Sequence, residues 1–222
     1  MEVRPSLLSR WVCLSLFAVL GHPGFVTGRG LELESATAAS SSPTKPDPKN
    51  AAATARWLVE ENSWGVLTTL SSDLKGAPFG NVVSFSDGPP ENGRGIPYFY
   101  LTALDPTARY ALKDPRSSVT ISEYPLGTCG ETDPENPTCA KITLTGKLVL
   151  VDRPSEEAKF AENALFTKHS EMEGWPKNHN FQIFKLEIKD IFLIDWFGGP
   201  KPLTISDYLG YKKNSVGFSS SW

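Results

Sequence analysis

Residues 79–101 read Phe79-Gly-Asn-Val-Val-Ser-Phe-Ser-Asp-Gly-Pro-Pro-Glu-Asn-Gly-Arg-Gly-Ile-Pro-Tyr-Phe-Tyr-Leu101. Up to residue 86, large apolar residues and an asparagine at odd positions alternate with other residues, which is the period of a strand with two different faces. The run Asp87-Gly88-Pro89-Pro90 ends this strand, because Asp-Gly favours a turn and proline lacks the N–H that a ladder needs. A second β-rich run begins at Ile96. The region therefore predicts two strands joined by a long loop.

Three other segments have helical patterns with a capping residue at the start. Asn50 precedes apolar residues at helical spacing, and Asp105 precedes a proline that suits the first turn of a short helix. After Ser155, two glutamates occupy the first turn and alanines recur on one face. We therefore expect helices over residues 51–62, 106–113 and 156–169.

Strand patterns fill most of the remaining chain. Alternating apolar and polar side chains predict strands over residues 64–70, 119–124 and 141–151, and one strand or a pair of strands over 181–196. Gly146 marks a bulge or a tight bend within its strand. Strands outnumber helices and do not alternate with them as in doubly wound folds. The pattern predicts a mainly β fold, a closed or nearly closed antiparallel barrel with peripheral helices.

The amino terminus has the pattern of a secretory signal peptide. Arg4 and Arg10 precede an apolar run, and small residues up to Gly28 suit a cleavage site. The run is shorter than the roughly 20 apolar residues that cross a bilayer, which favours a signal peptide over a membrane anchor. We expect a signal peptide over residues 1–28 and a mature chain without a membrane span, in a secretory lumen or outside the cell.

Composition divides the rest of the chain into three parts. Residues 29–49 carry few large apolar side chains and are rich in serine and proline, which predicts a flexible leader. Residues 50–211 have the length of one ordinary domain with a single core, and residues 212–222 form a tail. We find no internal repeat.

Two cysteines remain once the signal peptide is removed. Cys129 and Cys139 flank a loop-forming stretch, and in an oxidising compartment a disulfide between them is the simplest interpretation. Two free thiols are the alternative. A metal pair is disfavoured, because only His169 and His179 remain to complete such a site.

Charge and motif content exclude several classes of function. The formal net charge is −3, and it becomes −4 when the two arginines and one glutamate of residues 1–28 are removed. This mild acidity argues against nucleic acid or an anionic membrane as a partner. The sequence also lacks the nucleophile-elbow, phosphate-loop, zinc-protease and dinucleotide-binding motifs of common enzyme classes.

A series of motifs between Arg56 and Tyr208 resembles the CREG family, whose members are small secreted or endolysosomal proteins. The resemblance implies an antiparallel FMN-binding split barrel of the pyridoxamine-phosphate-oxidase type. The motifs are Trp64-Gly65-Val66-Leu67, Phe85-Ser86-Asp87-Gly88-Pro89-Pro90, Pro97-Tyr98-Phe99-Tyr100-Leu101, Trp175-Pro176, His179-Asn180 and Asp195-Trp196-Phe197-Gly198-Gly199-Pro200-Lys201.

The resemblance also implies a candidate phosphate site. Flavin-binding relatives of this barrel hold the cofactor phosphate near the end of the third strand and the start of the next helix, at the seam between two subunits. Thr102, Thr107, Arg109 and Lys113 occupy these positions. Hydroxyls and cations at a helix start can hold a dianion, and an arginine can bind two phosphate oxygens at once. The alternative is that these residues form an ordinary solvated helix face.

For function, the resemblance implies a homodimer that acts without catalysis, by binding a protein or a ligand, in a lysosome-like or vacuolar lumen or outside the cell. No cofactor is then required, and a loop such as 89–94 or 129–139 can fill the flavin pocket. The alternative is an FMN-dependent oxidoreductase of the pyridoxamine-phosphate-oxidase type, with FMN as its cofactor.

Overall fold

The computed structural model describes residues 44–212 of the 222-residue chain. The predicted signal peptide, most of the predicted leader and all but Lys212 of the predicted tail lie outside the described residues. The division of the chain into these segments stays a prediction. Within residues 44–212, no helix combines the length and apolar character needed to cross a membrane.

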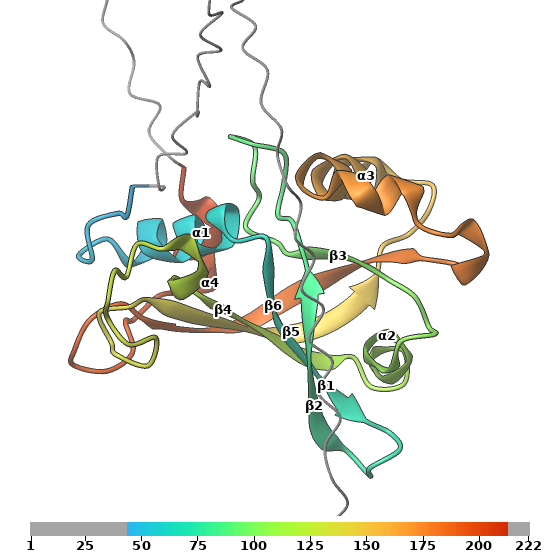
Figure 1. The fold of residues 1–222 in the computed structure, drawn as a ribbon, viewed down its shortest axis with the longest axis horizontal. Coiled ribbons are helices and arrows are strands. Elements are labelled where there is room, and N and C mark those ends of the chain that lie inside the picture. Colours follow the sequence, from blue (N-terminus) through green and yellow to red (C-terminus); the bar gives the residue numbers. More distant parts are fainter. Residues whose placement is uncertain (1–43, 213–222) are drawn as a thin grey trace, which may run out of the picture. The chain divides into compact units, whose positions relative to one another are not determined.

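A single sheet and four α-helices make up the described part (Figure 1). The strands are β1 (Trp64–Ser71), β2 (Ala77–Ser84), β3 (Tyr98–Leu101), β4 (Arg116–Ser122), β5 (Lys141–Leu150) and β6 (Gln182–Ile194). The helices are α1 (Ala51–Glu61), α2 (Pro106–Ala111), α3 (Glu156–Lys168) and α4 (Ile205–Gly210), with short 3-10 turns η1 (Tyr124–Leu126), η2 (Ser170–Gly174) and η3 (Lys177–His179).

The sheet curls so that its two edge strands come back together. Its order is β2-β1-β4-β5-β6-β3, and every neighbouring pair is antiparallel. Just beyond β2, Ser86 pairs with Tyr98 of β3 through backbone hydrogen bonds of 3.2 and 2.9 Å. This bridge joins the edges at one end, so the fold is an antiparallel half-barrel. The predicted mainly β, antiparallel architecture with peripheral helices is confirmed.

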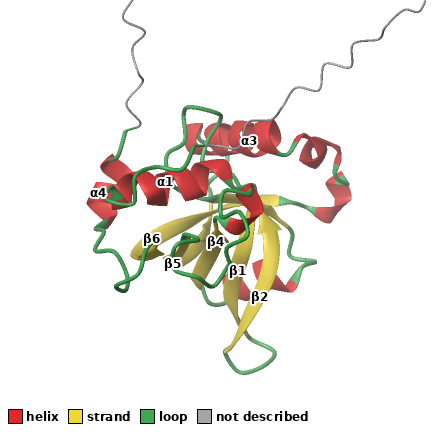
Figure 2. Ribbon diagram, turned by 60° about the vertical axis from the view of Figure 1, so that its left-hand side comes forward, coloured by secondary structure: helices red, strands yellow, loops and turns green. Residues whose placement is uncertain are grey.

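The helices lie around this sheet (Figure 2). α1 packs against α4 and over β4 and β5, α3 lies by β3 and β6, and α2 lies beside β1 and β2. The interior contains a continuous apolar core whose largest fully buried side chains include Phe85, Phe99, Phe184, Leu67 and Leu144. Inward-facing residues of most strands contribute to it, because successive side chains on a strand alternate between faces.

Several local predictions are confirmed by contacts. The Asn50 side chain accepts a hydrogen bond from the amide of Ala53 at 3.0 Å and caps α1, and Ser155 caps α3 in the same way. The pairing of β5 with β6 shifts register between Thr145 and Gly146, which is the predicted bulge. Cys129 and Cys139 are joined by a disulfide, as expected.

Other boundaries differ from the prediction. β4 begins at Arg116, three residues before the expected start, because its serine-rich first half has no apolar alternation but still pairs with β5. Of the two predicted possibilities for residues 181–196, the structure has one continuous strand, β6, and not a pair of strands. The shift in its pairing with β5 falls at Lys189. The short helix α4 was not predicted, although Thr204 caps it by accepting from the amide of Asp207.

The loop between β2 and β3 folds back against α1. The carboxylate of Asp87, only 1% exposed, accepts a hydrogen bond from the amide of Gly95 at 2.9 Å. Arg56 donates to the carbonyl of Gly93 at 2.6 Å and lies 3.8 Å from the Asp87 carboxylate. The Tyr208 hydroxyl donates to the carbonyl of Gly95 at 2.7 Å. The loop is therefore held from both α1 and α4.

The end of the predicted leader contacts the domain. Lys45 donates to the buried carboxylate of Glu123 and to the carbonyl of Thr138. Glu123 also accepts from the Thr128 hydroxyl at 2.8 Å and the Ala140 amide at 2.6 Å. Lys45 thus neutralises a carboxylate that the disulfide loop buries.

Candidate functional site

A cleft of about 490 Å³ lies where β2 and β3 face the segment that contains η2 and η3. Its walls come from parts of the chain that are far apart in sequence. The lining residues are Asn81, Val82, Val83, Ser84, Tyr100, Leu101, Thr102, Asp105, Met172, Trp175, Pro176 and Phe181.

Aromatic rings build one wall of the cleft. Tyr100 of β3 stacks on Phe181 with ring centroids 5.0 Å apart and on Trp175 at 6.0 Å. Trp175 and Phe181 lie 4.9 Å apart, and Phe166 of α3 meets Tyr100 edge-on at 5.4 Å. Such offset and edge-on pairs are favoured arrangements. The wall is therefore fixed from β3, from α3 and from the turns that follow α3.

Polar groups at the other side of the cleft form a fixed network. Asp105 caps α2, and its Oδ1 accepts from the amide of Thr107 at 2.7 Å. The side-chain amide of Asn81 on β2 donates to Asp105 Oδ2 at 3.2 Å and to the Thr107 hydroxyl at 3.0 Å. β2 and the start of α2 are thereby tied together beside the cleft.

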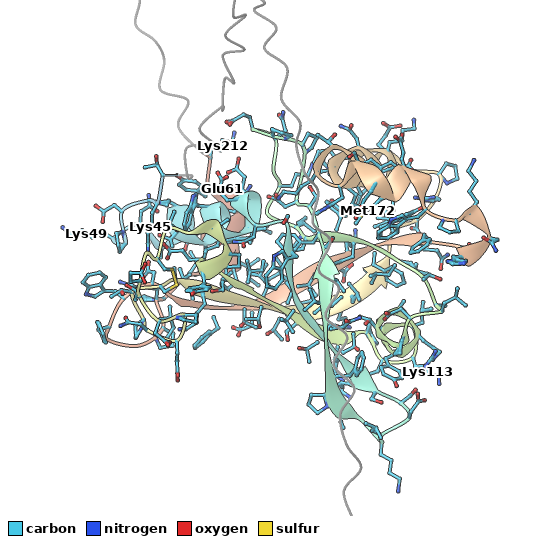
Figure 3. All side chains as sticks on the ribbon, in the orientation of Figure 1. Lys45, Lys49, Glu61, Lys113, Met172 and Lys212 are labelled. Carbon is cyan, nitrogen blue, oxygen red and sulfur yellow. A yellow bond between two sulfur atoms is a disulfide. The ribbon has the colours of Figure 1, made fainter. Side chains whose placement is uncertain are left out.

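The four predicted phosphate residues do not meet at one point. Thr102 lines the cleft, but its hydroxyl donates to the carbonyl of His179. Thr107 is buried and accepts from Asn81. Lys113 donates to the Ser72 hydroxyl at 3.1 Å in the β1–β2 turn. Figure 3 shows Lys113 well apart from Met172, which lines the cleft.

The fourth predicted residue, Arg109, also faces the β1–β2 turn. Its guanidinium lies 3.6 Å from the carboxylate of Asp73. The Tyr110 hydroxyl donates to Asp73 at 2.7 Å and lowers the pKa of that carboxyl, with smaller contributions from Arg109 and Lys113. The two predicted cations are therefore next to an ionised carboxylate outside the cleft. Among the cleft-lining residues of the described chain there is no lysine, arginine or histidine.

Sequence reasoning did not assign the residues that dominate the cleft. Tyr100 and Trp175 stand in motifs that carry the family resemblance, and Asn81 stands in the first strand of residues 79–101. The only sequence signal for a functional role of these residues was that they occur in these motifs. Their convergence with Phe181 depends on how the segment after α3 returns to β3, which no periodicity indicates.

Neither loop that was expected to fill the pocket lines the cleft within one chain. Residues 89–94 lie by α1 and α3, where Arg94 stacks over the ring of Phe160 at 3.5 Å. Residues 129–139 lie at the other end of the sheet, beside Glu123 and Lys141. No residue of either loop is among the described residues that line the cleft.

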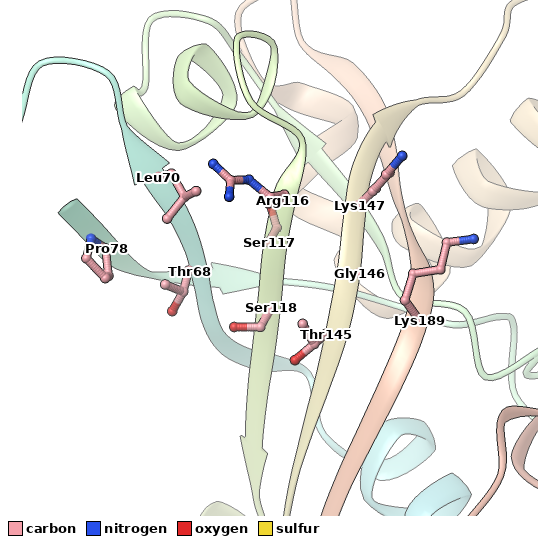
Figure 4. A pocket seen from close by; sticks show the side chains of 10 residues that line it. All are labelled: Thr68, Leu70, Pro78, Arg116, Ser117, Ser118, Thr145, Gly146, Lys147 and Lys189. Atoms are coloured by element: carbon pink, nitrogen blue, oxygen red, sulfur yellow. The ribbon is translucent and has the colours of Figure 1, made fainter. Parts of the chain in front are cut away.

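A second hollow, of about 390 Å³, lies on the outer face of the sheet (Figure 4). Its three cations are Arg116, Lys147 and Lys189, but their charged ends point in different directions in Figure 4. Arg116 is bound by Asp114 at 2.6 Å, and this contact lowers the pKa of Asp114 to about 2. The hollow therefore does not present converging cations to an anion.

Comparisons with known proteins agree on one family. A family model described as CREG, beta-barrel matches residues 46–210. Chicken Protein CREG1 is 40% identical over 80% of this chain and 94% of its own length, and human Protein CREG1 is 35% identical over 91% and 93%. Mouse Protein CREG2 is 39% identical over 76% of this chain, which spans 59% of the CREG2 length.

Solved structures share the fold at low sequence identity. A heme binding protein from Mycobacterium smegmatis superposes with a TM-score of 0.60 at 19% identity, over 77% of this chain and 63% of that chain. The protein Atu2129 from Agrobacterium tumefaciens gives a TM-score of 0.58 at 19% identity, over 76% and 64%. These likenesses concern the fold alone. From the match over residues 46–210 and from its relatives, the chain belongs to the CREG family of β-barrel proteins.

Proposed function

We propose that this CREG-family chain is a non-catalytic protein that acts by binding, as a homodimer, in a secretory-pathway lumen or outside the cell. The observation that carries the proposal is the composition of the cleft: an aromatic wall, one carboxylate, and no lysine, arginine or histidine among its described lining residues. A pocket of this kind offers binding surface and orientation but no nucleophile paired with a base.

The cleft fits FMN poorly. A phosphate dianion needs cations or backbone N–H donors, and the cations predicted for it, Arg109 and Lys113, face Asp73 and Ser72 in the β1–β2 turn. The charge that does line the cleft, on Asp105, repels a phosphate. The chemistry of the lining residues therefore supports binding without FMN over the alternative of an FMN-dependent oxidoreductase.

A row of apolar side chains on the outer face of the sheet supports the homodimer. Val82, Val66, Thr120, Thr143 and Phe192 are directly opposite one another across five successive strands. The two threonine hydroxyls hydrogen-bond to each other at 3.0 Å, and the three apolar residues are 63%, 37% and 42% exposed. Exposed apolar side chains in one row, whose two threonines satisfy each other's hydrogen bonds, are a feature that a second copy covers when an interface forms.

The homodimer is tested by placing a charge in this row. Val66→Asp, with Val66 between Val82 and Thr120 in this row, should weaken dimerisation by about a hundredfold, because the interface would bury two unpaired carboxylates. The measurement is sedimentation equilibrium of the mature chain. Leu74→Asp is the matched control, because Leu74 is 66% exposed in the β1–β2 turn and outside the row. Equal dissociation constants for both variants would remove the outer face from the interface.

The cofactor question is tested on the purified protein. Flavin bound in the predicted oxidoreductase would give stoichiometric visible absorbance, and the same spectrum would reveal heme, for which the mycobacterial structural neighbour is named. The proposal predicts neither chromophore. A stoichiometric flavin spectrum would contradict it and favour the oxidoreductase.

Two features support the proposed compartment. Disulfides persist in oxidising lumens and outside the cell, and Cys129 is paired with Cys139. The amino-terminal residues have the pattern of a secretory signal peptide. The final compartment, whether extracellular or lysosome-like, belongs to the same proposal.

A further inference from the structure

The cleft between β2 and β3 is lined by aromatic rings, apolar side chains and one carboxylate. Its aromatic wall consists of Tyr100, Trp175 and Phe181, which pack on one another as one group and all line the cleft. The faces of aromatic rings carry partial negative charge and attract cations. An apolar floor from Val83 and Met172 completes the hollow.

Asp105 and Asn81 also line the cleft, and both have oxygen atoms that can accept hydrogen bonds from a ligand. The Asp105 carboxylate receives hydrogen bonds from Thr107 and Asn81, which leave part of its acceptor capacity unused. Asn81 uses its amide nitrogen for Asp105 and Thr107, so that its carbonyl oxygen is left as an acceptor. Because these donors hold the carboxylate in place, it does not need to reorganise when a ligand binds.

The cations near α2 do not pair with Asp105, so its negative charge is available to a cationic ligand. Arg109 lies against Asp73, and Lys113 donates to Ser72, so neither cation of α2 neutralises Asp105. Within the described residues that line the cleft, Asp105 is the only charged side chain. A ligand that enters therefore meets aromatic rings and a single carboxylate.

We propose that this cleft binds a small organic ammonium ion that carries an apolar or aromatic body. The ammonium group pairs with Asp105 and lies against the ring faces, and the apolar body fills the space lined by the valines and Met172. This inference rests on the proposed function, because it names the ligand class of the same binding cleft.

Calorimetric titration of the full mature chain with two probes of equal size tests the proposal. Phenethylammonium supplies the cation and an aromatic body, and phenylacetate supplies a similar body with the opposite charge. The expected result is saturable binding of phenethylammonium and no binding of phenylacetate. Equal binding of both probes, or binding of neither, overturns the proposal.

Substitution of Asp105 tests whether phenethylammonium binds in the cleft. Asp105→Asn retains an oxygen for capping α2 and removes the charge, so phenethylammonium affinity should fall about tenfold or more. Asp114→Asn is the matched control, because Asp114 lies two residues before β4 and pairs with Arg116 outside the cleft. Unchanged affinity in Asp105→Asn, at an unchanged melting temperature, overturns the assignment.

Trp175→Ala distinguishes a ligand from a second copy. It should weaken phenethylammonium binding while the chain remains a dimer. Loss of the dimer would mean that the partner copy covers the cleft, which contradicts a free-ligand site. A flavin spectrum would refute the proposed function itself, whereas a flavin-free dimer that ignores phenethylammonium would refute only this inference.

Discussion

At the scale of single residues, the buried carboxylate of Asp87 is one whose charge is costly. Burial raises the pKa of Asp87, although the Gly95 amide, Lys168 and Arg56 work in the opposite direction. The native state therefore holds this proton at a pH where the unfolded chain has lost it. The stabilisation is complete below the ordinary pKa of 3.8 and is lost as pH rises through the raised value. This residue therefore favours the folded state more at acidic pH than at neutral pH.

The wild type should lose unfolding free energy as pH rises above the ordinary carboxyl pKa of 3.8, and Asp87→Asn should lack this dependence. Urea denaturation across this range measures the slope, which is separate from any constant loss caused by leaving Arg56 without its carboxylate. Asp114→Asn is the control, because Arg116 lowers the pKa of Asp114 to about 2 and removes its titration from this range. Parallel slopes for wild type and Asp87→Asn would contradict the assignment.

At the scale of elements, the sequence alone predicts helix caps but does not predict which distant segments pair as strands. The caps Asn50 and Ser155 bond to their own helices within three residues, so the sequence alone could indicate them. The start of β4 could not be predicted, because its serine-rich residues become a strand only through pairing with β5. For α4, a single buried Tyr208 supplies the inward contact, which is too little periodicity for a prediction.

The bulge at Gly146 gives a prediction at the same scale. A Cβ at this position would lie 2.0 Å from the carbonyl oxygen of Glu187 and 2.8 Å from its carbonyl carbon. Backbone atoms of β6 must move to admit it, so Gly146→Ala should cost about 2 kcal/mol or more of unfolding free energy. Gly174→Ala is the control, because no atom lies within 4 Å of its Cβ. Chemical denaturation that shows equal stability for both variants would contradict a tightly packed bulge.

At the scale of the whole domain, the fold was predictable and the site only in part. Alternation and turn residues predict an antiparallel barrel, whereas the cleft needs β2, β3 and residues 172–181 to meet in space. Thr102 lines this hollow, whereas Arg109 and Lys113 turn toward the β1–β2 hairpin, and the phosphate role of all three stays a prediction. The β1–β2 turn supplies the partners of these two cations. Sequence spacing does not show that this turn lies beside α2.

The central claim is that the domain binds through a cleft that has exchanged phosphate chemistry for aromatic and acidic chemistry. The most direct measurement is titration of the purified mature chain with FMN, followed by quenching of flavin fluorescence, with riboflavin as the control that lacks the phosphate. The account predicts no saturable quenching by either compound. Stoichiometric binding of FMN, stronger than that of riboflavin, would contradict it, because it would mean that the chain still holds the cofactor phosphate.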